Sequence, residues 1–126
     1  MLRFDATECG SNVKGGSVLC GASNSKAKAA EWHSLIFSRA TEDDDPDDWG
    51  PYFELDDQSQ GFYTRSARVQ FTGTLFKVSI VPPQAQRFGH RTIVVDLKRC
   101  SPRQIAKLKS GLRMVFRDAP GRLRDG

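Results

Sequence analysis

The chemistry that this chain offers most openly is that of carboxylates, which crowd the stretch from Thr41 to Gln58. Nine residues of this stretch are acidic, although the chain of 126 residues carries a formal net charge of +4. Three interpretations are open: a calcium site, a surface that docks a cationic partner, and a solvated surface loop.

The calcium interpretation rests on spacing. Four carboxylates match the ligand spacing of an EF-hand loop, namely Asp43, Asp45, Asp47 and Glu54. Asp48, however, stands where that loop needs glycine for its sharp turn, and Pro46 stiffens the segment. No helical pattern flanks the stretch. We therefore predict neither a metal site nor a cofactor.

The docking interpretation rests on repulsion and on aromatic neighbours. Like charges held close together repel, and a basic partner relieves that repulsion and is attracted faster by the complementary field. Trp49 and Tyr52 would act as aromatic anchors, whereas Phe53 is expected in the core. The predicted partner-binding carboxylates are Asp43, Asp44, Asp45, Asp47, Asp48, Asp56 and Asp57.

Catalytic patterns are weak in this sequence. His33 falls in an apolar strand candidate and His90 in a Pro/Gly loop, and neither is near a nucleophile motif. Asp56 and Asp57 are adjacent, and adjacent strand residues point to opposite faces. The chain has neither a P-loop nor a GxGxxG motif. We expect that the protein is not an enzyme.

The three cysteines, Cys9, Cys20 and Cys100, form no CxxC pair, and their odd number argues against a secreted disulfide framework. We interpret them as reduced thiols, with a Cys9–Cys20 bridge as the less favoured alternative. The first residues lack the apolar run of a signal peptide, and no stretch approaches the ~18 apolar residues of a membrane span. These observations favour a cytoplasmic protein.

Charge divides the chain into two halves. Residues 1–60 hold five Lys/Arg and twelve Asp/Glu, a net charge of −7, whereas residues 61–126 hold fourteen and three, a net charge of +11. Many cations of the second half fall on one predicted helix: Arg103, Lys107, Lys109, Arg113 and Arg117. This basic face gives the alternative function, a small nucleic-acid-binding module, although no known recognition motif accompanies it.

The helix itself is the clearest element. Ser101 is a good N-cap, Pro102 fits the first helical position, and Gln104 completes a capping box. Apolar residues then recur at helical spacing, at Ile105, Leu108, Leu112, Val115 and Phe116. Gly111 interrupts this stripe and suggests that another element packs closely there. Residues 118–121 end the helix, and we expect residues 118–126 to form a loose tail.

Strand patterns precede the helix. Alternation or apolar, β-branched content predicts strands over residues 2–6, 17–22, 31–40, 51–56, 67–81 and 91–99. The spacing of residues 31–40 would also fit a short helix. Residues 9–16 are turn material, and a turn at Thr72-Gly73 divides residues 67–81 into a hairpin. Residues 23–31 fit either a loop or a helical turn. The prediction is one α+β domain over residues 1–126: a mainly antiparallel sheet with the C-terminal helix on one face. An uncovered edge strand would favour a dimer.

Two segments carry a resemblance to a known family. Tyr52, Glu54, Asp56, Asp57 and Gln58 match one motif, and Leu108, Gly111, Leu112, Arg113 and Phe116 match a helix of the form LxxGLRxxF. With these motifs, residues 32–116 resemble the immunity protein 10 family, small bacterial proteins that neutralise polymorphic toxins. Thr64-Arg65-Ser66 departs from the glycines expected after Tyr63.

The resemblance implies an antitoxin that binds its cognate toxin domain one to one. Many such toxins are nucleases with basic substrate grooves, which a carboxylate-rich surface can occupy in place of phosphate.

Overall fold

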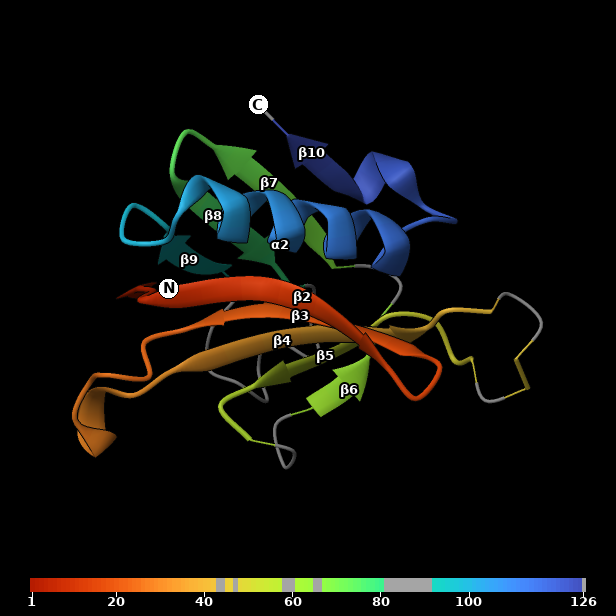
Figure 1. Ribbon diagram of the computed structural model, residues 1–126, viewed down its shortest axis with the longest axis horizontal. Coiled ribbons are helices and arrows are strands. Elements are labelled where there is room, and N and C mark those ends of the chain that lie inside the picture. The colour runs from red at the N-terminus through yellow and green to blue at the C-terminus, as the bar shows by residue number, and fades with distance from the viewer. Residues whose placement is uncertain (43–44, 47, 58–60, 65–66, 81–91, 126) are drawn as a thin grey trace.

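A computed structural model describes the chain except for residues 43–44, 47, 58–60, 65–66, 81–91 and 126, and except for the side chain of Ala29. Its described residues form ten β-strands in two sheets and one α-helix near the C-terminus (Figure 1). The fold class is therefore α+β, as predicted, with two mostly antiparallel sheets in place of the expected single sheet.

The first sheet, sheet A, has the strand order β1-β9-β8-β7-β10. Its strands are β1 (Leu2–Asp5), β9 (Thr92–Asp96), β8 (Leu75–Ser79), β7 (Arg68–Thr72) and β10 (Leu123–Asp125). Its central pairs are antiparallel, whereas β1 and β10 are added in parallel to β9 and β7. Strands from both ends of the sequence thus flank a central antiparallel unit.

The second sheet, sheet B, is antiparallel and follows the order of the sequence. Its strands are β2 (Glu8–Lys14), β3 (Ser17–Ser23), β4 (Ser34–Ala40), β5 (Tyr52–Leu55) and β6 (Gly61–Tyr63). A short 3₁₀ turn, η1 (Ala29–Glu31), precedes β4. Gly15 and Gly16 join β2 to β3 with φ angles of +61° and +79°, values that glycine adopts without strain. Burial alternates along β3, β4 and β5, so each presents one apolar face to the interior.

The helix α2 (Pro102–Val115) begins with the predicted capping box. The Ser101 hydroxyl accepts from the Gln104 N–H at 3.1 Å, and the Gln104 side chain accepts from the Ser101 N–H at 2.8 Å. Its residues Leu108, Leu112 and Val115 are buried. This helix lies against β2, β3 and β4 of sheet B.

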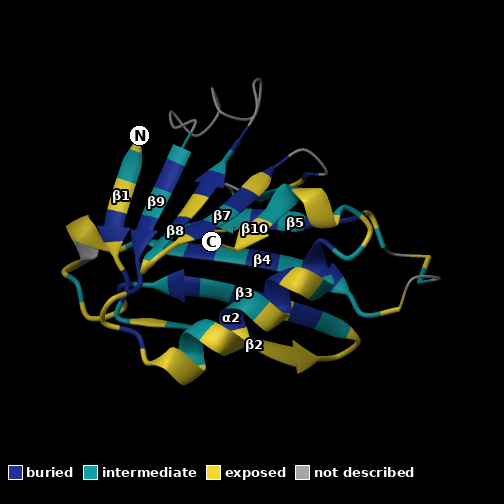
Figure 2. Cartoon of the chain, turned by 90° about the horizontal axis from the view of Figure 1, so that it is seen from above, coloured by how far each residue is buried: buried dark blue, intermediate teal, exposed yellow. Residues whose placement is uncertain are grey.

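One hydrophobic core joins both sheets and the helix. Phe37 of β4 contacts two other rings of this core. Its ring centroid lies 5.1 Å from that of Phe53 and 5.5 Å from that of Phe116, which follows α2. The opposite flank of α2 faces sheet A, where Lys109 lies over the ring of Phe71. Figure 2 shows buried residues alternating along the strands, while the outer face of α2 is exposed.

Three predictions of local structure were wrong. Residues 9–16 were expected to be a turn, yet most of them belong to β2, whose polar residues pair with β3. Residues 118–126 were expected to be loose, yet residues 120–122 form the 3₁₀ turn η3 (Pro120–Arg122), and β10 pairs with β7. The turn between β7 and β8 lies at Gly73-Thr74, one residue later than predicted.

Within the described part of the chain, α2 is too short and too polar to cross a bilayer.

Candidate partner-binding surface

Strand β5 divides the predicted partner-binding residues between two places. Tyr52 begins this strand next to Trp49, whereas Asp56 and Asp57 follow its other end. The fold therefore does not bring the described members of the predicted set together on one surface. Asp43, Asp44 and Asp47 lie outside the described residues.

Asp48 was predicted to be a partner-binding carboxylate, but its side chain is largely covered and is paired within the fold. Its side chain is 7% exposed, and its oxygens accept from Arg39 Nε and Nη2 at 3.2 and 3.3 Å. Burial alone would raise the pKa of Asp48, but hydrogen bonds from Arg39 and from the Gly50 N–H outweigh it and lower the pKa. Asp48 is therefore the counter-ion of a buried arginine, and its charge is already used within the fold.

The same carboxylate shapes the loop that carries Trp49. Asp48 Oδ1 accepts from the Gly50 N–H two residues ahead, at 3.0 Å, as in an Asx-turn. Gly50 is buried with a φ of +88°, a conformation that glycine supplies without steric penalty. The turn leaves the Trp49 side chain 67% exposed. An exposed tryptophan held by a buried ion pair suits the predicted role of an anchor.

Two tyrosines from neighbouring strands extend this aromatic surface. Tyr52 of β5 pairs with Tyr63 of β6, and their ring centroids are 5.2 Å apart. The Tyr63 ring is also 6.2 Å from that of Trp49, and Tyr63 is 54% exposed. The Tyr52 ring packs directly over Gly61. Only glycine fits there, because a Cβ at position 61 would collide with the Tyr52 phenol.

The Tyr52 hydroxyl donates to Glu54 Oε1 at 3.1 Å. Burial raises the pKa of Tyr52, and the bond to Glu54 adds to this effect. Sequence reasoning missed Tyr63 and did not include Glu54 among the binding residues. Two tyrosines on consecutive strands were a usable signal for cross-strand pairing, but the register of β5 with β6 could not be read from the sequence.

These side chains line a pocket of about 380 Å³, which we call the aromatic–acidic pocket. Its acidic and aromatic lining residues are Asp45, Asp48, Trp49, Tyr52, Glu54 and Tyr63, and the Gly15-Gly16 turn borders it. Among the described residues that line this pocket, Arg39 is the one cation, and Asp48 and Asp118 hold it in ion pairs. The pocket therefore combines π-faces with the carboxylates of Asp45 and Glu54, a combination suited to an arginine or lysine side chain.

Asp56 serves the fold at the other end of β5. Its N–H donates to the Ser34 carbonyl at 2.7 Å, and its Oδ1 accepts from the Ser34 N–H at 3.0 Å. His33 Nδ1 lies 3.3 Å from the same carboxylate. Asp56 thus fixes the start of β4, in a left-handed conformation with φ of +68°. Asp57 is exposed next to it, away from the aromatic–acidic pocket.

The basic helix face is only partly exposed. Arg103 and Lys107 point to solvent, whereas Lys109 and Arg113 lie beside Asp125, at 2.9 and 3.7 Å. Arg117 Nη2 lies 3.8 Å from Asp48 Oδ2. Part of the positive charge on which the nucleic-acid alternative depends is therefore engaged in ion pairs within the fold.

In the part of the chain that the structure describes, no group of three or more His, Cys, Asp or Glu side chains could hold a metal ion. No family model matches the chain, and neither curated proteins nor solved structures gave a match. The resemblance to the immunity protein 10 family therefore stays a prediction from the motifs at residues 52–58 and 108–116.

Proposed function

We propose that this protein is an immunity-type inhibitor, which binds a cationic toxin domain one to one through the aromatic–acidic pocket. The observation that supports this proposal best is the exposure of Trp49 and Tyr63 beside the carboxylates of Asp45 and Glu54. Large exposed aromatic rings are typical anchors of protein interfaces, and neighbouring carboxylates complement the charge of a cationic partner.

The pocket chemistry favours a protruding arginine or lysine of the partner. A cation over an aromatic face contributes ~0.5–2 kcal/mol, depending on how far it is desolvated. The rings of Trp49, Tyr52 and Tyr63 form one contiguous cluster that offers such faces. Asp45 and Glu54 would then pair with the bound cation, and Arg is favoured over Lys because its planar fork also stacks on rings.

Inhibition follows from occupancy alone. A toxin that acts on a phosphate-bearing substrate must present basic side chains in its groove, and a bound carboxylate surface occupies them. No bond is formed or broken in this step, so the protein acts by stoichiometric blocking. The free thiols of Cys9, Cys20 and Cys100 suit a reducing compartment, and we place this activity in the cytoplasm.

Co-expression with the C-terminal domain of the toxin encoded by the adjacent gene tests the proposal. The wild-type chain should restore growth and co-purify with that domain. The double variant Trp49→Ala/Tyr63→Ala, and separately Asp45→Lys, should lose protection while remaining folded, because these side chains are not buried. The matched control is Arg103→Glu/Lys107→Glu on the exposed face of α2, which should protect as wild type does.

The opposite pattern would overturn the proposal. If the α2 variant loses protection and the pocket variants keep it, the interface lies elsewhere. If the wild-type chain gives no protection and instead binds plain RNA or DNA with strong salt dependence, the nucleic-acid alternative replaces it.

The chemistry of the pocket can be tested without a toxin. A tri-arginine peptide should shift the tryptophan fluorescence and the amide resonances of residues 48–54 in a saturable manner. A tri-citrulline peptide, which has nearly the same shape without the charge, should bind at least about fivefold more weakly, since a lost charge contact removes roughly 1 kcal/mol. Equal binding of the two peptides would contradict recognition by charge.

A further inference from the structure

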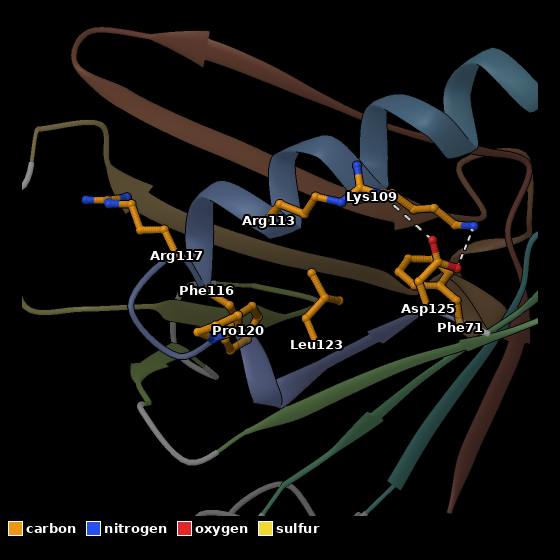
Figure 3. A pocket seen from close by; sticks show the side chains of 8 residues that line it. All are labelled: Phe71, Lys109, Arg113, Phe116, Arg117, Pro120, Leu123 and Asp125. Carbon is orange, nitrogen blue, oxygen red and sulfur yellow. Dashed lines mark hydrogen bonds and ion pairs between the residues drawn. The ribbon is translucent and has the colours of Figure 1, made fainter.

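A second pocket, of about 470 Å³, lies between α2 and the segment that follows it, on the flank of the helix that faces sheet A. Figure 3 shows its side chains. None of the residues predicted from the sequence to bind a toxin lines it, although Lys109, Arg113 and Arg117 of the predicted basic helix face do. Its volume falls in the range of small-molecule sites, which are about 300–1,000 Å³.

The floor of this pocket is apolar and firmly held. Phe71 of β7 and Phe116 belong to the hydrophobic core and are each 1% exposed. Pro120 and Leu123 provide further apolar surface from the segment that leads into β10. Because the core fixes these rings, the pocket is preformed, and a ligand would not have to order it.

Positive charge lines one side of this floor. Lys109 Nζ lies 5.0 Å from the centroid of the Phe71 ring and 2.9 Å from Asp125 Oδ1, and Arg113 Nη2 lies 3.7 Å from Asp125 Oδ2. Lys109 and Arg113 therefore converge on one carboxylate, whereas Arg117 is turned away from it (Figure 3). The described lining residues include three cations but one carboxylate, Asp125.

We propose that this pocket binds a small organic acid whose apolar body, an aromatic ring or a branched chain, contacts Pro120 and Leu123 above the buried rings of Phe71 and Phe116. The carboxylate of that acid would bind Lys109 and Arg113 at the place that Asp125 occupies now. The ligand can displace Asp125 from these cations, because the Asp125 side chain is almost half exposed. Surface ion pairs such as those of Asp125 with Lys109 and Arg113 each stabilise the fold by only about 0–1 kcal/mol. A neutral ligand would leave these cations to Asp125, and a cationic ligand would be repelled.

Three phenyl compounds that differ only in their terminal group test the proposal: 4-phenylbutyrate, 4-phenylbutanamide and 4-phenylbutan-1-amine. Each is titrated into the full chain while amide resonances are followed. The acid should saturate with a dissociation constant on the order of 1 mM or below, as expected for about twelve non-hydrogen atoms. Its shifts should centre on residues 71, 109–113 and 116–125. The amide should bind about fivefold more weakly, and the amine should not saturate.

Two substitutions with opposite effects sharpen the test. Arg113→Gln should weaken binding of the acid about fivefold, whereas Asp125→Asn should strengthen it a few fold by removing the competing carboxylate. Both side chains are exposed enough for the variants to fold, which the amide spectra would verify. Arg103→Gln, at the exposed start of α2, is the matched control and should bind as wild type does.

Three results would each overturn the proposal. These are equal affinity for the acid and the amide, opposite or absent effects of Arg113→Gln and Asp125→Asn, and shifts that centre on the basic outer face of sheet A around Arg68 and Lys77. The last result would show general attraction of anions by a basic surface.

Discussion

Arg39 and Asp118, which lie 79 residues apart in the sequence, form a two-pronged ion pair inside the fold. Arg39 Nη1 donates to Asp118 Oδ1 at 2.7 Å, and Nη2 donates to Oδ2 at 2.9 Å. The same guanidinium donates to Asp48 and to the carbonyl of Val115. One side chain thus ties β4, the acidic stretch and the end of α2 together.

Replacing Arg39 by methionine should therefore destabilise the fold strongly. The substitution leaves the Asp48 carboxylate buried without its main counter-ion, and breaking a buried pair in this way costs about 3–5 kcal/mol. Urea unfolding should show a loss near the lower end of that range, because Asp118 is partly exposed. The control is Arg3→Met, whose contact with Asp96 is 3.7 Å long and largely exposed on the arginine side, and which should cost no more than about 1 kcal/mol. A similar loss in both variants would contradict the central place given to Arg39.

Acid should weaken the fold through Asp48 and Asp96. The pKa of Asp96 is lowered mainly by the Lys98 N–H, and that of Asp48 by Arg39 and Gly50 against the effect of burial. Each folded-state pKa lies below the unfolded value of about 4, so the stabilisation is complete above that value and is lost as the pH falls through the folded-state pKa. The free energy of unfolding should fall between about pH 5 and pH 2, and less steeply in Asp48→Asn. Parallel curves for wild type and variant would contradict the lowered pKa of Asp48.

Gly111→Ala should destabilise the protein, although alanine is the better helix former by about 1 kcal/mol. A Cβ at this position would lie 2.6 Å from Ser11 Cβ and 2.8 Å from Cys20 Cβ, atoms fixed to neighbouring strands of sheet B. Overpacking of this kind costs about 1–3 kcal/mol, which exceeds the gain in helix propensity. Ser110→Ala, on the exposed side of the same helix, should be neutral or slightly stabilising in thermal unfolding. A higher melting temperature for Gly111→Ala would show that α2 can move away from sheet B.

The thiols should react slowly in the folded protein. Burial raises the pKa of Cys9 and Cys20 to about 12 and also raises that of Cys100. At neutral pH the reactive thiolate of Cys9 or Cys20 is therefore about a thousandfold rarer than that of an unperturbed cysteine. An aromatic disulfide reagent should modify little of the native chain and should titrate all three thiols after denaturation. A fast initial reaction without denaturant would contradict the burial of Cys9, and fewer than three reactive thiols would indicate a disulfide.

Local pattern was enough to predict part of this fold. The capping box at Ser101 and the apolar stripe of α2 are local signals, and they predicted the helix to within two residues. Alternation likewise predicted β5 with Phe53 and Leu55 facing inward. Long-range pairing was not predictable in this way. Strand β2 is polar because it is an edge strand, and β10 is a strand only because β7 offers a free edge to it.

The candidate site shows the same division. Trp49 and Tyr52 were predicted as anchors because aromatic residues stand next to the carboxylates, and both line the aromatic–acidic pocket. Tyr63 was missed because its place depends on the register of β6 with β5. Asp48 was misassigned because counting charges cannot show which carboxylate neutralises a buried arginine.

The parallel pairing of β1 with β9 also bears on how fast the protein folds. Leu2 lies opposite Ile93, so sheet A cannot close until segments from distant parts of the chain have met. Loop closure over such distances is entropically unfavourable before any contact compensates for it, and proteins dominated by such pairings fold in milliseconds to seconds. We expect refolding from urea to fall in that slow range, and the β2–β3–β4 meander, whose contacts are local, to form before β1 docks.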